Sequence, residues 1–377
     1  MFMKKTALMV MAAAVSAAMF SSCTTSVEDT EIKVLQDRVI EITYNAFDFD
    51  KSAEYLNKYD PQEMGACSAV LVNIDGKVYV GRDYDFYCSD APAVVIRNNG
   101  GKYKTLAIGN SPASFDPWTD AESYEVRPEV LPAAPYLCCD VMSEAGIYAE
   151  TNIRPKEAGL TCTSTNPGKP RRCTQTFMQT MLCNYGSIDE ILEHINDYDW
   201  FDLQNIGFEQ SFFIADQSGR SVIVEFGADK AMWQESQVNA NFFINPELYA
   251  IEKMGCGENR LCKELEYLPE VKTEDDIFTM MKKGAYDQFY HSDVDTDFAI
   301  PEFYEVIGYD KDSYAADPEG ARKAAAEKIA EFSQYTWEER VANHSWESTF
   351  ITAANITDLY LHVHFSEHYG IDFTVAL

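Results

Sequence analysis

Cys67 and Arg82 are the residues whose types and spacing point most directly to chemistry. Cys67 opens an apolar run, Asp75-Gly76 is a strong two-residue turn signal, and residues 77–82 complete a predicted β-hairpin. In that hairpin Cys67 lies opposite Tyr84, and Arg82 lies diagonally from Cys67 on the same face. A permanent cation beside a thiol favours the thiolate, which is the reactive form.

This thiol also needs a base, and the chain contains only six histidines. A free α-amino group titrates near ~8 and could accept the thiol proton if Cys67 were the N-terminal residue. That requires cleavage after Ala66, where small residues leave room for self-cleavage. Asp85 points to the other face in plain alternation, so its participation requires a bulge or a strand end near Tyr84. The alternative is a cysteine that only packs in the core.

Further polar residues follow in recognisable segments. These are Gly81–Asp85 with Arg82 and Asp85, Met142–Ile147 followed by Asn152, Asn245 after a second hairpin, and Asn259-Arg260. In this order they resemble the motifs of the choloylglycine hydrolases, a family of linear amide C–N hydrolases in the N-terminal-nucleophile class that includes bile salt hydrolases and penicillin V acylases. The resemblance covers most of residues 67–377.

The resemblance implies a fold, an activity and a set of site residues. The implied fold is a four-layer αββα sandwich of two antiparallel sheets, and the implied substrate is a small-molecule N-acyl amide such as a conjugated bile salt, penicillin V or an N-acyl amino acid. No cofactor and no metal are implied. The residues in question are Cys67 as nucleophile, Arg82 and Asp85 around the thiol and amine, Asn152 and Asn245 as oxyanion donors, and Arg260. Two alternatives stay open: an acyltransferase of the penicillin acyltransferase type and a non-enzymatic ligand-binding lipoprotein.

Hydrophobic periodicity independently predicts an α+β chain with strands at both ends of the domain and helices between them. The predicted strands beyond the first hairpin are 211–215, 220–226, 241–244, 349–353, 359–365 and 371–375. The predicted helices are 174–183, one capped by Ser187, one capped by Thr273, and 318–332.

The N-terminus predicts export. Residues 1–23 resemble a lipoprotein signal in which Cys23 is acylated, with ordinary secretory cleavage as the alternative. Residues 24–66 are predicted to be a leader or pro-segment with a weakly helical pattern around Ile32, Leu35 and Val39, and residues 67–377 the amidase domain. The predicted location is the periplasm or the outer membrane of a bacterium, with membrane contact only through a lipid on Cys23.

The charge and the remaining polar residues limit the partners. A formal net charge of -31 argues against a nucleic-acid or anionic-membrane partner, because an acidic field repels phosphates and lipid headgroups. The ten cysteines fit no zinc spacing and leave disulfide pairing open, as the sequence leaves the oligomeric state open. His362, His364 and His368 invite a metal site, but exposed histidines on an edge strand are the simpler interpretation.

Overall fold

The computed structural model describes residues 25–27, 30–46, 66–109, 119–120, 125–126, 131–155, 161–203, 208–251, 258–285, 313, 316–332, 334–343, 346–366 and 368–377. The expected signal peptide with Cys23, and residues 47–65 of the expected leader, lie outside the described residues. Among the described residues, no helix combines the length and the apolar character needed to cross a bilayer.

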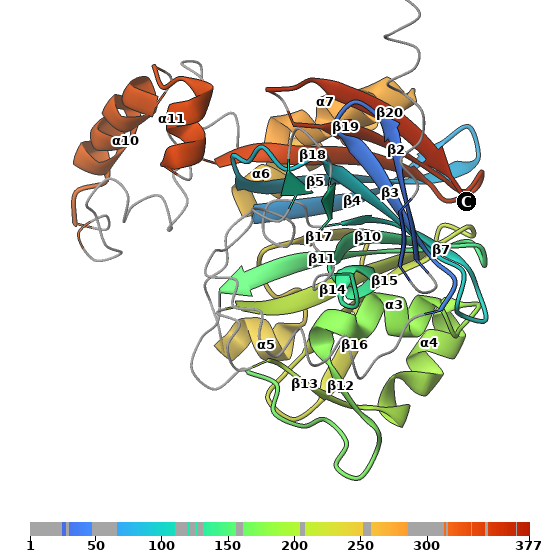
Figure 1. Cartoon of the computed structure of the whole chain (residues 1–377). Helices are drawn as coiled ribbons and strands as arrows, with labels where there is room; N and C mark the ends of the chain where they lie inside the picture. Colours follow the sequence, from blue (N-terminus) through green and yellow to red (C-terminus); the bar gives the residue numbers. More distant parts are fainter. Residues whose placement is uncertain are drawn as a thin grey trace, which may run out of the picture.

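Two large sheets form the centre of the molecule (Figure 1). In spatial order, the ten-stranded sheet contains β1 (Thr25–Val27), β2 (Thr30–Gln36), β3 (Val39–Tyr44), β6 (Ala93–Asn98), β7 (Thr105–Gly109), β10 (Cys138–Ser143), β11 (Ile147–Pro155), β14 (Phe208–Asp216), β15 (Ser221–Phe226) and β16 (Ala231–Glu235). The six-stranded sheet contains β17 (Val238–Ala240), β4 (Ala66–Ile74), β5 (Lys77–Tyr87), β18 (Trp346–Asn355), β19 (Tyr360–Phe365) and β20 (Ile371–Ala376).

Within the described ranges, the other elements are two small sheets, short 3-10 helices and the α-helices. The small sheets pair β8 (Thr119–Asp120) with β9 (Glu125–Val126) and β12 (Arg171–Cys173) with β13 (Asp199–Phe201). The helices are α3 (Phe177–Leu182), α4 (Ile188–His194), α5 (Pro246–Ile251), α6 (Glu258–Tyr267), α7 (Glu274–Gly284), α10 (Pro318–Phe332) and α11 (Trp337–Ala342).

These elements stack as four layers, which confirms the predicted αββα sandwich. The two sheets face each other, α3 and α4 pack on the outer side of the ten-stranded sheet, and α6 and α7 pack on the outer side of the six-stranded sheet (Figure 1). Buried apolar side chains fill each gap between layers, and Cys67 belongs to the cluster between the two sheets. The helices α10 and α11 lie beside the sandwich in Figure 1.

The first hairpin matches its predicted register. Cys67 pairs with Tyr84 and Ala69 pairs with Arg82 across β4 and β5. Asp75 and Gly76 both have positive φ, at 52° and 80°, as a tight two-residue turn requires. Gly81 allows α7 to approach β5 closely, because a Cβ at this position would lie 2.7 Å from a methyl of Ile277.

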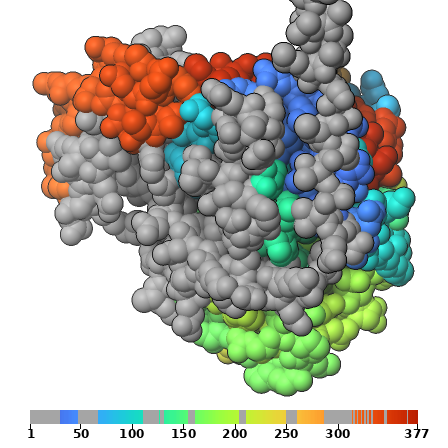
Figure 2. Space-filling model, viewed as in Figure 1, coloured from blue at the N-terminus to red at the C-terminus, as the bar shows by residue number. Residues whose placement is uncertain are grey.

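The described part of the expected leader belongs to the sandwich. β2 and β3 are strands, so the predicted helical pattern around Ile32, Leu35 and Val39 was wrong. β3 pairs with β6 in parallel, which makes the ten-stranded sheet mixed rather than purely antiparallel. Ile40 and Ile42 are fully buried in it. In Figure 2 the blue surface of this segment lies beside the red C-terminal strands, where Gln36 Nε2 donates to the carbonyl oxygen of Asp372.

Most other predicted elements are confirmed, with one exception near the site. The second hairpin, the C-terminal strands and the helices at 177–182, 274–284 and 318–332 form as expected. The strand expected at 241–244 is wrong, because β17 ends at Ala240. The cysteines within the described residues, Cys67, Cys88, Cys138, Cys139, Cys162, Cys173, Cys183 and Cys262, all carry free thiols.

Candidate active site

The hairpin brings Arg82 to the thiol of Cys67, as its register predicts. Arg82 Nη2 lies 3.7 Å from Cys67 Sγ and donates to the carbonyl oxygen of Thr151 at 2.9 Å. Cys67 and Arg82 are both fully buried between the two sheets. Because a buried guanidinium needs compensating charge, its other contacts show what holds it there.

Two carboxylates of the facing sheet hold Arg82 in place. Asp140 Oδ1 lies 2.8 Å from Arg82 Nε, and Glu150 Oε2 lies 3.4 Å from the same atom. Burial raises the pKa of Glu150 to about 7, although Arg82 opposes that shift. Burial also raises the pKa of Asp140 against the effect of Arg82. The cation beside Cys67 is therefore anchored by β10 and β11, on the opposite side of the inter-sheet core.

The thiol itself is neutral in the intact chain. Burial raises the pKa of Cys67 to about 12, and the guanidinium of Arg82 lowers it by a smaller amount. Arg82 thus acts in the direction predicted from the sequence, but burial outweighs it. A thiol in this state is a poor nucleophile until its surroundings become more polar.

A second set of polar groups surrounds the backbone of Cys67 on the other face of β4. Cys67 N donates to Asn241 Oδ1 at 2.7 Å, and Arg260 Nη2 donates to the same oxygen at 2.7 Å. Arg260 Nη2 also lies 3.4 Å from the carbonyl oxygen of Cys67. Arg260 Nη1 donates to Asp85 Oδ2 at 3.0 Å. The pairing of Asp85 with β4 has no bulge. Asp85 reaches the site indirectly, because Arg260 binds both Asp85 and the carbonyl oxygen of Cys67.

More carboxyl groups than guanidinium groups lie on this face. Asp83, Asp85 and Glu264 are all fully buried near Arg260. Burial and the neighbouring Asp85 raise the pKa of Asp83 well above its usual value. Burial raises the pKa of Glu264 to about 8. With a pKa of about 8, Glu264 holds a proton near neutral pH, and the excess of carboxyl groups would stabilise a further positive charge at Cys67 N.

The hydroxyl of Ser348 completes this side of the site. It donates to Asp85 Oδ1 at 2.6 Å and lies 2.9 Å from Asp83 Oδ1. Ser348 lies on β18, next to β5, so a second strand of the same sheet fixes the orientation of the Asp85 carboxylate. The sequence motifs did not indicate this residue.

Asn152 lies one residue from the Arg82 contact at Thr151. In the amide orientation that satisfies both of its ends, Nδ2 donates to Glu150 Oε2 at 2.9 Å and Oδ1 accepts from Ala240 N at 3.1 Å. Asn239 Nδ2 donates to Glu150 Oε1 at 2.9 Å. In the intact chain Asn152 thus bridges Glu150 and β17, so its role as an oxyanion donor stays a prediction.

Asn245 occupies a different place from the other predicted residues. Its backbone N donates to Glu225, and its Oδ1 accepts from Glu247 N at 3.0 Å at the start of α5. Of the predicted residues, the structure brings together Cys67, Arg82, Asp85 and Arg260, with Asn152 adjacent. The asparagine that accepts the hydrogen bond of Cys67 N is Asn241, four residues before Asn245. Asn241 directly follows β17, which pairs with β4, and that long-range pairing is the signal that sequence motifs lacked.

Solved structures of a penicillin V acylase and of a conjugated bile acid hydrolase resemble this chain. A penicillin V acylase from Agrobacterium tumefaciens is 13% identical, with 82% of this chain and 86% of that chain covered and a TM-score of 0.47. Two single-residue variants of the conjugated bile acid hydrolase from Clostridium perfringens are 12% and 11% identical, each with 82% of this chain and 92% of that chain covered, at TM-scores of 0.49 and 0.41.

The sequence resemblance named the same two kinds of enzyme, penicillin V acylases and bile salt hydrolases. No family model and no curated protein sequence matches the chain. At this level of similarity the comparisons identify no substrate, and the argument for function rests on the site itself.

Proposed function

We propose that this chain is a cysteine amide hydrolase whose nucleophile, Cys67, becomes the N-terminal residue when the peptide bond to Ala66 is cut. The observation that carries the proposal is the set of contacts around Cys67 N. This amide nitrogen is the group that would become the α-amine, and Asn241 accepts its hydrogen bond at 2.7 Å while Arg260 binds the same oxygen. A cysteine that only packed in the core would need neither contact.

The location of the bond favours self-cleavage over cutting by a separate protease. Cys67 is fully buried, Ala66 and Cys67 both pair with β5, and β17 pairs with β4 from Ser68 onward. A protease would have to pull this segment out of the sheet. In self-cleavage Cys67 Sγ attacks the carbonyl carbon of Ala66, the C–N bond breaks, and the thiol proton passes to the departing amine. Water then hydrolyses the thioester, which leaves a carboxylate on Ala66 and a free thiol and amine on Cys67.

The same two groups would then cut substrate. Cys67 Sγ attacks the amide carbonyl of an N-acyl substrate, and the α-amine accepts the thiol proton and delivers it to the leaving nitrogen. Cleavage supplies the α-amine as a base next to the thiol, and Arg82 keeps lowering the pKa of Cys67, so the thiol of the cleaved chain is more reactive than that of the intact chain. The developing oxyanion needs hydrogen-bond donors, for which Asn152 remains our candidate.

The substrate class we propose is a small N-acyl amide, such as a conjugated bile salt, penicillin V or an N-acyl amino acid. The support is the sequence resemblance, together with a nucleophile flanked by cationic groups. If an amine replaces water at the second step, the same acyl-enzyme would act as an acyltransferase.

We also propose export to the cell envelope with a lipid on Cys23, which labelling with a radioactive fatty acid tests against a Cys23→Ala variant.

A hydrolysis screen tests the activity. The full chain, Cys67→Ala and Cys173→Ala are each incubated with conjugated bile salts, penicillin V, N-acyl amino acids and N-acyl ethanolamines, with and without an added amine acceptor. Cys173 is a suitable control because burial also raises its pKa to about 12. We expect Cys67→Ala to lose on the order of 10⁴-fold in turnover and Cys173→Ala to keep its activity. Turnover by Cys67→Ala at the parent rate would contradict the proposal.

A further inference from the structure

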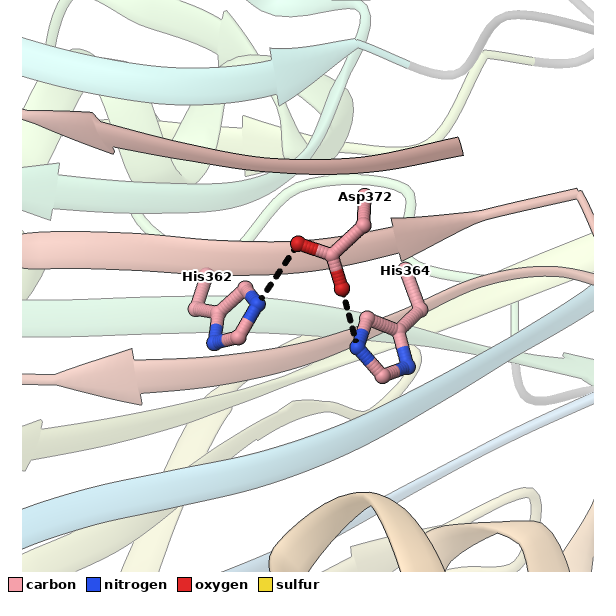
Figure 3. Close-up of side chains that lie close together, drawn as sticks. All are labelled: His362, His364 and Asp372. Carbon is pink, nitrogen blue, oxygen red and sulfur yellow. Dashed lines mark hydrogen bonds and ion pairs between the residues drawn. The ribbon is translucent and has the colours of Figure 1, made fainter. Parts of the chain in front are cut away.

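Two histidines and an aspartate gather on the outer face of the six-stranded sheet, away from the inter-sheet core that contains Cys67. His362 and His364 alternate on β19 with buried core residues, so both side chains point outward. Asp372 on β20 pairs directly with His364. Figure 3 shows the carboxylate of Asp372 between the two imidazole rings. Neighbouring strands fix all three backbones, so the sheet itself builds the cluster.

The donor atoms are close enough to share one ion. His362 Nε2 lies 3.0 Å from Asp372 Oδ1, and His364 Nε2 lies 2.6 Å from Asp372 Oδ2. The ligand atoms of the three residues all lie within 4.8 Å of one another. Ligands at about 2.0 to 2.1 Å from a tetrahedral zinc ion are about 3.3 Å apart, so small side-chain rotations would bring these atoms to a common centre.

A second carboxylate contacts His362, and an aromatic ring packs on His364. His362 Nδ1 contacts Glu274, the first residue of α7, and the hydroxyl of Tyr360 also bonds to Glu274. Histidine ligands of metal ions commonly give their other ring N–H to a carboxylate, which fixes the tautomer. The ring of Phe278 stacks on His364 with the centroids 3.6 Å apart. Both imidazole rings are thus held with Nε2 towards Asp372.

The cluster is accessible from solvent on one side. The side chains of His362, His364 and Asp372 are 18%, 33% and 56% exposed. A pocket of about 210 Å³ adjoins them, and His364, Asp372 and Lys282 are among the residues in its wall. An ion could therefore enter, and the pocket leaves room for water as a further ligand. The ammonium of Lys282 weakens cation binding but leaves the ligands free to approach.

We propose that His362, His364 and Asp372 form a binding site for one divalent transition-metal ion of the zinc class, with an open coordination position facing this pocket. Two imidazoles and one carboxylate suit zinc, cobalt, nickel or copper better than magnesium or calcium, which prefer oxygen ligands. None of the three ligands belongs to the Cys67 site, although Ser348 lines the adjoining pocket, so metal binding can be tested independently of the proposed amidase activity. The sequence favoured exposed histidines on an edge strand over a metal site. The structure differs, because β19 lies between β18 and β20, and the carboxylates of Glu274 and Asp372 lie beside the histidines.

Titration of the full chain with Co(II), followed by displacement with Zn(II), tests the site. We expect one equivalent to bind with the weak visible bands of nitrogen and oxygen ligation, without the near-ultraviolet band of thiolate ligation. His364→Ala and Asp372→Asn should weaken binding by about 100-fold or more, and Glu274→Gln by about 10- to 100-fold. Asp372 is more than half exposed, so its neutral replacement should not disturb folding.

His194→Ala is the matched control, because His194 forms an exposed pair with Asp197 at 2.6 Å on a different part of the surface. Its Co(II) affinity should equal that of the parent chain. Equal affinity in His364→Ala and Asp372→Asn would overturn the proposal. So would a thiolate band, a preference for Mg²⁺ or Ca²⁺, or an affinity in the parent chain weaker than about 1 mM.

Discussion

Arg260 Nη1 donates to Asp85 Oδ2 at 3.0 Å, and the same guanidinium lies 3.4 Å from the carbonyl oxygen of Cys67. Arg260 comes from α6 and Asp85 from β5, so a helix and a strand meet at the residue that carries the nucleophile. Both partners are fully buried. Removing one partner leaves the other charge buried without compensation, which typically costs about 3 to 5 kcal/mol.

Asp85→Asn should therefore lower both stability and maturation. We expect the free energy of unfolding to fall by about 3 kcal/mol. We expect the rate of cleavage before Cys67 to fall by roughly 100-fold, because Arg260 loses the partner that positions it. Urea unfolding and a time course on denaturing gels measure the two effects. Glu247→Gln, which breaks an exposed ion pair with Lys230, is the control and should change neither. Cleavage before Cys67 at the parent rate in Asp85→Asn would show that the Asp85–Arg260 ion pair plays no part in the mechanism.

Asn241 and Asn245 allow a direct test, because the structure places Asn241 at Cys67 whereas the sequence motif predicted Asn245. Asn241→Ala should slow cleavage and turnover by on the order of 100-fold, because Cys67 N and Arg260 lose the oxygen that they share. Asn245→Ala should cost about 1 kcal/mol in stability through the start of α5 and leave the rates near those of the parent. The reverse ranking of the two variants would restore Asn245 to the site.

The strands before Cys67 should stay in the molecule after cleavage. β3 pairs along its length with β6, and Ile40 and Ile42 are fully buried, so dissociation would expose core and leave strand hydrogen bonds unmade. We expect the active protein to run as two chains on a denaturing gel and as one particle in native mass spectrometry. An active particle that has lost residues 30–46 would contradict this.

The stability of the uncleaved Cys67→Ala chain should fall as pH rises. Burial raises the pKa of Glu264 to about 8, above the ordinary glutamate value, so the folded chain retains a proton that the unfolded chain has lost. Between about pH 4.5 and 8 the folded state therefore binds more protons, and stability declines with pH and then levels off. Glu264→Gln removes this contribution. Urea unfolding at several pH values should show a shallower decline in the Cys67→Ala, Glu264→Gln double variant, and an unchanged slope would refute the assignment.

Local patterns allowed one half of the site to be predicted. The Asp75-Gly76 turn and strict alternation place Arg82 beside Cys67, because hairpin register depends only on neighbouring residues. Asn241 could not be found this way, since it lies 174 residues from Cys67 and reaches it through the pairing of β17 with β4. Pairing of such distant segments leaves no periodic trace in either one.

The strands before Cys67 are hard to predict for a related reason. Ile32, Leu35 and Val39 fit a helical spacing, while Ile40, Ile42 and Tyr44 alternate as a strand, and short apolar segments satisfy both periods. The parallel partner β6 decides between them. In the same way the sequence shows His362 and His364 two residues apart, but only the pairing of β19 with β20 reveals Asp372 beside them.

The most direct test of the account is N-terminal sequencing and intact-mass analysis of a preparation whose amidase activity has been measured. We predict that activity rises in proportion to the amount of polypeptide that begins at Cys67. The Cys67→Ala variant should keep the peptide bond between residues 66 and 67 and should be inactive. A fully active preparation in which every chain retains the bond between Ala66 and Cys67 would contradict the central claim.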